Sequence, residues 1–269
     1  MAEQLTLNYQ YFGGEGHSPM VILHGLLGSS RNWTTVAREL AKEFEVFALD
    51  LRNHGQSPHA SEMDYLALAG DVLAFLDANQ LETVTLLGHS MGGKTAMRLA
   101  VDHPNRVETL IVADISPKPY AAHHRIEMGA MQAMPLDLLK SRKEAETHLE
   151  RFGVDEWAHR QFLLTNLVRD AETKAFKWQI NVPGIDRNME HVALSPLAEN
   201  ERYEGPTLFI RGEKSKFMTD ADTATIQSHF PYSRVTQVSD AGHNVHVENK
   251  AGFLEAVASL KYTDWGCEV

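Results

Sequence analysis

VTLLGHSMGGK, residues 84–94, is the stretch of this 269-residue chain that decides the fold. Its first four residues form a short apolar run, as expected of a strand buried in a sheet. The next five, GHSMG, match G-x-S-x-G, in which a serine occupies a sharp, strained turn between a strand and a helix. Both glycines matter because a Cβ at either position would collide with neighbouring backbone. A helix-like stretch follows from Gly93, so the segment predicts a strand, a turn that exposes Ser90, and a helix.

Apolar runs of the same kind recur on both sides of this segment. They lie at 20–23, 46–49, 110–113, 207–211 and 234–238. Helix-like stretches alternate with them, at 33–40, 65–79, 94–103, 219–229 and 250–260. The runs in the first half show no polar alternation, which is typical of strands covered on both faces. The pattern therefore predicts an α/β fold with a mostly parallel central sheet flanked by helices.

The alternation stops after Ile115-Ser116-Pro117 and resumes near Gly205-Pro206. The residues between are predicted to be mostly helical, with no convincing strand. We therefore expect one α/β core, residues 1–116 and 205–269, with a helical cap inserted at 117–204. Large apolar side chains of this cap either pack it on itself or line a pocket; they are Met128, Met131, Met134, Phe152, Trp157, Phe162, Phe176 and Trp178.

Composition and charge exclude several classes of protein. The 43% hydrophobic and 23% charged residues are ordinary globular values, and the length suits one domain with an insertion. A net charge of −11 without a run of Lys or Arg argues against nucleic acid as a partner. The N-terminus lacks a signal pattern, and no apolar stretch is long enough for a membrane span. The single cysteine, Cys267, cannot form an internal disulfide and is predicted to lie in a frayed tail, so we expect a cytoplasmic protein.

A serine nucleophile needs a histidine to take its proton during attack. Of the fourteen histidines, His243 lies on the loop after the last predicted strand and before the last predicted helix, where this fold needs a base. His246, three residues later, is the alternative. A zinc site built on this pair is disfavoured because no further ligand cluster supports it, and no metal is expected.

Four segments together resemble one known family. They are HGLLGS at 24–29, DLRNHGQS at 50–57, GHSMGGK at 88–94 and DISP at 114–117. The combination resembles the bacterial YbfF-type esterases of the α/β-hydrolase superfamily, across the whole core. The resemblance implies an α/β-hydrolase fold and activity on short-chain esters and acyl thioesters, with no cofactor. Within DLRNHGQS we expect a tight turn and a local pair between Asp50 and Arg52.

The resemblance also implies where an oxyanion would be held. In such hydrolases one backbone N–H comes from the loop after an early strand and another from the residue after the nucleophile. Those donors are Leu26 and Met91, and the start of the helix after Ser90 adds the positive end of its dipole. We expect four neighbouring residues to contact substrate: His24, Gly25, Leu27 and His89.

The carboxylate partner of the histidine is ambiguous. The family often carries it after the strand at 207–211 as G-x-x-D, but this loop reads GEKS and ends at Ser215. Nearby candidates are Glu213, Asp220 and Asp222. Asp114 follows the run at 110–113, at the sheet edge where α/β active sites assemble, and matches the YbfF-type acid after the sixth strand of that fold. We favour Asp114, with capping of the turn that opens the insertion as its alternative role.

The expected function is hydrolysis of short- to medium-chain acyl esters or thioesters through an acyl-enzyme. A C–C bond hydrolase or lyase would use the same serine, histidine and aspartate, so it stays open. A halide- or epoxide-cleaving enzyme would need an aspartate at position 90. The expected partner is a small acyl ester or thioester. Acyl length, physiological substrate and oligomeric state, monomer or homodimer, stay open.

Overall fold

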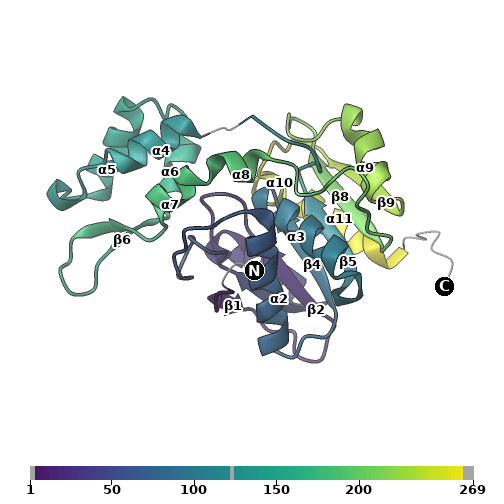
Figure 1. Ribbon diagram of the computed structural model, residues 1–269. Coiled ribbons are helices and arrows are strands. Elements are labelled where there is room, and N and C mark those ends of the chain that lie inside the picture. The colour runs from purple at the N-terminus through teal and green to yellow at the C-terminus, as the bar shows by residue number, and fades with distance from the viewer. Residues whose placement is uncertain (1–3, 122–123, 263–269) are drawn as a thin grey trace.

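The computed structural model describes residues 4–121 and 124–262 of the chain (Figure 1). Cys267 and its predicted frayed tail lie outside these residues. Within them, a seven-stranded sheet forms the centre of the molecule. Its strands are β1 Tyr9–Tyr11, β2 Pro19–Leu23, β3 Glu45–Leu49, β4 Val84–His89, β5 Val107–Ala113, β8 Thr207–Gly212 and β9 Ser233–Val238.

The order of the strands across the sheet is β1-β3-β2-β4-β5-β8-β9. Every neighbouring pair is parallel except β1 and β3. The six apolar runs are all strands, which confirms the predicted mostly parallel sheet. The sequence did not predict β1, because its three residues, YQY, form a half-exposed edge with no apolar run.

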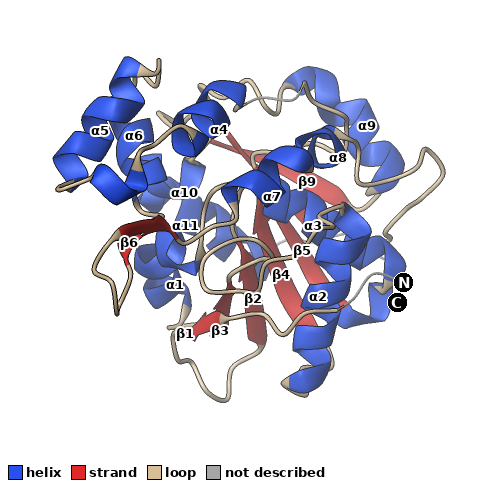
Figure 2. Cartoon of the chain, turned by 60° about the vertical axis from the view of Figure 1, so that its left-hand side comes forward, coloured by secondary structure: helices blue, strands red, loops and turns tan. Residues whose placement is uncertain are grey.

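Helices cover both faces of the sheet (Figure 2). The helices of the core are α1 Thr34–Leu40, α2 Tyr65–Ala78, α3 Met91–Asp102, α9 Thr223–His229, α10 Val245–Glu248 and α11 Lys250–Ala258. On β2, Val21 and Leu23 join the apolar cluster that includes α2 and α3. Met20 and Ile22 join the cluster on the other face, with α1 and α11. Burying such a side chain stabilises the fold by roughly 1.5–3 kcal/mol, so both faces of the strand are apolar.

The segment between β5 and β8 is mainly helical. It contains α4 Arg125–Gln132, α5 Arg142–Arg151, α6 Trp157–Leu164, α7 Val182–Arg187 and α8 Met189–Ala193, together with the antiparallel pair β6 Leu167–Arg169 and β7 Phe176–Trp178. The expectation of no strand here is wrong: three residues per strand are too few to show a period of two. Figure 1 shows α4, α5, α6 and this hairpin projecting to one side of the sheet.

The DLRNHGQS segment forms a buried turn, and one predicted contact in it is wrong. Arg52 does not pair with Asp50. Its guanidinium donates two hydrogen bonds to Asp71 of α2, at 2.7 and 2.8 Å, because a fully buried guanidinium needs a bidentate acceptor. Asp50 instead accepts the backbone N–H groups of Ser30 and Gln56. The turn is tight as predicted: Gly55 has φ 54°, and a Cβ there would lie 2.1 Å from the Asp50 carboxyl carbon.

Candidate active site

The register of the central strands brings three loop starts to one edge of the sheet. Leu23 of β2 is paired with Gly88 of β4, and His89 of β4 is paired with Ala113 of β5. The residues that follow β2, β4 and β5 therefore leave the sheet together. The strand order also reverses between β2 and β4, and such a reversal opens a crevice at the carboxyl ends of parallel strands.

Ser90 occupies the sharp turn between β4 and α3. Its backbone has φ 52° and ψ −118°, a conformation that typically costs a non-glycine residue about 1–3 kcal/mol. A Cβ on Gly88 would lie 2.2 Å from the carbonyl oxygen of Gly92, and one on Gly92 would lie 2.5 Å from that of Leu23. Both positions therefore require glycine, as predicted. The helix begins at Met91, earlier than expected, so its N-terminal N–H groups start directly after Ser90.

His243 connects Ser90 to Asp114. Its Nε2 lies 3.1 Å from Oγ of Ser90, and its Nδ1 lies 2.8 Å from Oδ2 of Asp114. The ring of Phe217 stacks on the imidazole at 3.8 Å. Asp114 is fully buried and accepts hydrogen bonds from Gly212 N–H, at 3.0 Å, and from the Ser215 hydroxyl. The three groups singled out from the sequence thus form one continuous row.

The alternative acids make other contacts. Asp222 lies 2.5 Å from Nζ of Lys118, and Asp220 lies 2.6 Å from a guanidinium nitrogen of Arg211. Glu213 accepts the backbone N–H of Asp240. Each carboxylate is thus engaged outside the row formed with His243.

His246, the alternative base, is a packing residue. Its ring stacks on Trp33 at 4.0 Å with an interplanar angle of 7°, and it is buried. Burial lowers the pKa of His246 to about 3. The ring is therefore neutral and points into the core.

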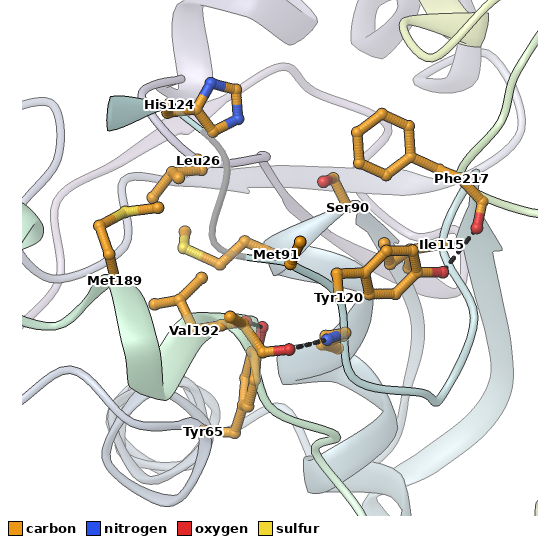
Figure 3. A pocket seen from close by; sticks show the side chains of 13 residues that line it. Leu26, Tyr65, Ser90, Met91, Ile115, Tyr120, His124, Met189, Val192 and Phe217 are labelled. Atoms are coloured by element: carbon orange, nitrogen blue, oxygen red, sulfur yellow. Dashed lines mark hydrogen bonds between the residues drawn. The ribbon is translucent and has the colours of Figure 1, made fainter. Parts of the chain in front are cut away.

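Leu26 and Met91, whose N–H groups are the predicted oxyanion donors, lie at the same pocket as Ser90. Both residues line the pocket beside it (Figure 3). Within the described part of the chain, neither amide has a hydrogen-bond acceptor. They are thus available to an oxygen at the serine.

Two buried histidines hold the loop that carries Leu26. His24 accepts the N–H of Leu51 at 3.0 Å, and His54 accepts the N–H of Leu27 at 3.1 Å, each through Nε2. The proton of each ring is then on Nδ1, which donates to a backbone carbonyl. Burial lowers the pKa of His54 to about 3. Its ring is therefore neutral at ordinary pH and keeps the hydrogen bond from Leu27. His54 was not predicted from the sequence, although it lies within the DLRNHGQS segment.

None of the four residues expected to contact substrate is among the residues that line the pocket. His24 is 1% exposed and braces the loop, and Leu27 is 1% exposed and packs in the core. His89 lies 2.8 Å through Nε2 from the carbonyl oxygen of His243, and a Cβ on Gly25 would lie 2.8 Å from Nδ1 of His89.

The pocket over Ser90 is largely apolar. Its lining residues are Leu26, Tyr65, Ser90, Met91, Lys94, Ile115, Tyr120, Ala121, His124, Met189, Val192, Ala193 and Phe217 (Figure 3). They come from α2, α3, α8 and several loops, and most were not predicted. None of the eight Met and aromatic residues proposed for the cap is among them. Four of those eight belong to the apolar cluster and two more pack against it.

Lys94 is the one lysine in this lining. It is 2% exposed, and Nζ donates to the carbonyl of Leu194 at 2.6 Å and lies 4.7 Å from the ring centroid of Tyr120. Burial lowers the pKa of Lys94 to about 7. A partly neutral amine suits this apolar wall.

None of the helices in the described residues is both long and apolar enough to cross a membrane.

Comparison with known proteins agrees with this architecture. The family model described as "alpha/beta hydrolase fold" matches residues 18–250. The sn-1-specific diacylglycerol lipase ABHD11 of Danio rerio is 37% identical, over 96% of this chain and 83% of that protein. The esterase YbfF of Escherichia coli (strain K12) is 33% identical, over 90% of this chain and 92% of that protein, which confirms the predicted resemblance. A solved structure of a marine microorganism esterase has a TM-score of 0.90 at 36% identity and covers 97% of this chain and 100% of that one.

Proposed function

We propose that this chain, which belongs to the alpha/beta hydrolase family, is a serine esterase that hydrolyses acyl esters or acyl thioesters through an acyl-enzyme on Ser90. Two relatives that match most of the chain are named as a lipase and an esterase, which supports hydrolysis of an ester. The observation that carries the finer proposal is the row of atoms from Ser90 Oγ through both nitrogens of His243 to Asp114. Such a row activates a hydroxyl that is otherwise unreactive at neutral pH.

In the first step, Oγ of Ser90 forms a bond to the carbonyl carbon of the substrate while Nε2 of His243 takes the hydroxyl proton. The carbonyl oxygen becomes an oxyanion and accepts the N–H groups of Leu26 and Met91. Asp114 stays ionised, fixes the imidazole with its proton on Nδ1 and stabilises the imidazolium that forms. His243 then gives its new proton to the departing alcohol or thiol, and the acyl group remains on Ser90.

In the second step, water attacks the acyl-enzyme. His243 takes a proton from the water as its oxygen bonds to the carbonyl carbon, and the same two N–H groups hold the second oxyanion. The bond to Ser90 Oγ breaks, and the serine recovers its proton from His243. The products are a carboxylic acid and the free enzyme.

The apolar lining favours an acyl chain of short to medium length. Leu26, Met189 and Val192 present hydrocarbon beside Ser90. Each methylene group that becomes buried contributes roughly 0.8 kcal/mol. We therefore expect kcat/KM to rise about fourfold per added methylene until the pocket is full, and then to fall.

A lipase acting on glycerolipids is the second candidate. The observation that favours it is the identity of 37% to a diacylglycerol lipase over nearly the whole chain. The chemistry at Ser90 would be the same, and only the leaving alcohol and the acyl length would differ.

Activity of the wild-type chain and of Ser90→Ala tests the proposal. The substrates are p-nitrophenyl esters and acyl-CoA thioesters of graded length, with a diacylglycerol for the second candidate. We expect turnover by the wild type, loss of nearly all turnover in Ser90→Ala, and labelling of Ser90 by a fluorophosphonate. A matched control is Ser116→Ala, because Ser116 is buried nearby and its Oγ has no hydrogen-bond partner among the described residues. Undiminished hydrolysis by Ser90→Ala would end the proposal.

A further inference from the structure

A second cluster of titratable side chains lies at the pocket, apart from Ser90. His124, directly before α4, lines the pocket, while Glu127 follows on α4 and His159 is on α6. One ring nitrogen of His124, a carboxylate oxygen of Glu127 and one ring nitrogen of His159 all lie within 4.8 Å of one another. The described residues contain no other group of three histidine, cysteine or acidic side chains this close.

The distances within the cluster differ from those of hydrogen bonds. Nδ1 of His124 lies 3.4 Å from Oε1 of Glu127, and Nε2 of His159 lies 3.6 Å from the same oxygen. Nitrogen and oxygen atoms joined by a hydrogen bond are usually about 2.7–3.2 Å apart. Nδ1 of His124 is buried, and no hydrogen-bond partner for it lies in the described part of the chain. The carboxylate of Glu127 thus lies between the two imidazoles at the distances of loose ion pairs.

The same distances fit ligands of one metal ion. Around a tetrahedral Zn²⁺ with bonds of about 2.0–2.1 Å, two ligand atoms are separated by roughly 3.3–3.4 Å. The two separations from Glu127, 3.4 and 3.6 Å, are close to such an edge, and the two histidine nitrogens lie within 4.8 Å of each other. Two histidines and one carboxylate are a donor set that suits zinc and its neighbours rather than calcium or magnesium.

The exposure of the cluster suits a site that an ion can enter. The side chains of His124, Glu127 and His159 are 32%, 16% and 29% exposed, so they are shielded without being sealed. Three protein ligands leave a fourth position for water. His124 directly precedes α4, Glu127 lies on α4 and His159 lies on α6, and these two helices are separate parts of the projecting segment (Figure 2).

We propose that His124, Glu127 and His159 bind one divalent transition-metal ion of the zinc class at the wall of the pocket. The ion links the start of α4 to α6. Because His124 also lines the pocket, its binding fixes one part of the wall over Ser90. The site is independent of the proposed esterase chemistry, which does not pass through the ion.

Titration of the metal-free full-length chain with Zn²⁺, followed by calorimetry, tests the site directly. We expect one ion per chain and a higher thermal midpoint, since a ligand of the folded state stabilises it. Glu127→Gln, which keeps the shape of the side chain, and His159→Ala should each weaken binding at least tenfold and abolish the shift in midpoint. Co²⁺ in place of Zn²⁺ should give the intense visible absorption of a tetrahedral complex in the wild type only.

The matched control is His191→Ala, because His191 is exposed on α8 and outside the cluster. It should bind Zn²⁺ as the wild type does. If Glu127→Gln and His159→Ala bind Zn²⁺ as tightly as the wild type, the proposal is wrong. It is also wrong if His243→Ala is the only variant that loses binding. Circular dichroism of each variant without metal distinguishes lost ligands from lost folding. None of these measurements needs enzymatic activity, so their failure is separable from failure of the proposed function.

Discussion

The hydroxyl of Ser215 donates a hydrogen bond to Oδ2 of Asp114, the same oxygen that lies 2.8 Å from Nδ1 of His243. The backbone N–H of Phe217 donates to Oγ of Ser215 at 3.1 Å, which leaves the hydroxyl proton directed at Asp114. Ser215 stands where the family often carries its acid, on the loop after β8. The loop after β8 thus contacts the carboxylate that lies beside His243, although that carboxylate belongs to Asp114, directly after β5.

Ser215→Ala tests what this hydrogen bond contributes. A hydrogen bond to a charged group contributes about 1.5–3 kcal/mol, and part of that would be lost in orienting Asp114. We expect kcat for a p-nitrophenyl ester to fall about tenfold with little change in KM. Ser215→Thr keeps the hydroxyl and should retain most of the activity. If Ser215→Ala has the wild-type kcat, the contact is only structural.

A comparison of Asp114→Asn with Asp222→Asn decides the assignment of the acid. Loss of an orienting aspartate typically costs on the order of 10⁴ in kcat. We expect such a loss for Asp114→Asn, because an amide cannot stabilise the imidazolium. Asp222 is engaged with Lys118, so Asp222→Asn should keep kcat within severalfold of the wild type. Steady-state kinetics on one ester measures both, and a larger loss in Asp222→Asn would reverse the assignment.

The features that the sequence predicted are local. Buried strands of a parallel sheet are continuous apolar runs, and the six runs indicated the strand ends. A parallel sheet brings those ends to one edge, so Ser90 and Asp114 could be expected there from the sequence alone. His243 could be added because it follows the last run.

The features that the sequence did not predict depend on distant partners. Tyr65 of α2 lines the pocket and donates to the carbonyl of Val192 on α8, 127 residues away. No local pattern predicts such a contact, and the pocket walls consist largely of them. The partner of Arg52 was missed for the same reason: Asp71 lies 19 residues further along the chain, on α2. The strands β6 and β7 were not predicted because each has only three residues.

The Lys94→Met variant should alter how stability depends on pH. The pKa of Lys94 is about 7 in the folded chain, against an ordinary value of 10.5. Between these two pH values the unfolded chain binds more protons than the folded chain. The free energy of unfolding of the wild type therefore increases as the pH rises. Lys94→Met lacks this increase in the free energy of unfolding, which is at most about 1.4 kcal/mol per pH unit.

Urea unfolding at pH 7, 8 and 9 measures the effect. The stability of the wild type relative to Lys94→Met should increase from pH 7 to pH 9. Lys42→Met is the control because the Lys42 side chain is 69% exposed, and this variant should follow the wild type. Parallel pH profiles for the wild type and Lys94→Met would contradict a lowered pKa.

His246→Phe should make the fold more resistant to acid. Burial holds the pKa of His246 at about 3, against an ordinary 6.5, so the unfolded chain binds more protons between these values and stability is lost as pH falls below 6.5. Phenylalanine keeps the stack on Trp33 and removes the buried Nδ1, which has no hydrogen-bond partner among the described residues. In urea unfolding the variant should match or exceed the wild type at pH 7 and lose less stability by pH 5. His17→Phe, at an exposed position, should follow the wild type. An equally steep loss in His246→Phe would show that other groups cause the sensitivity to acid.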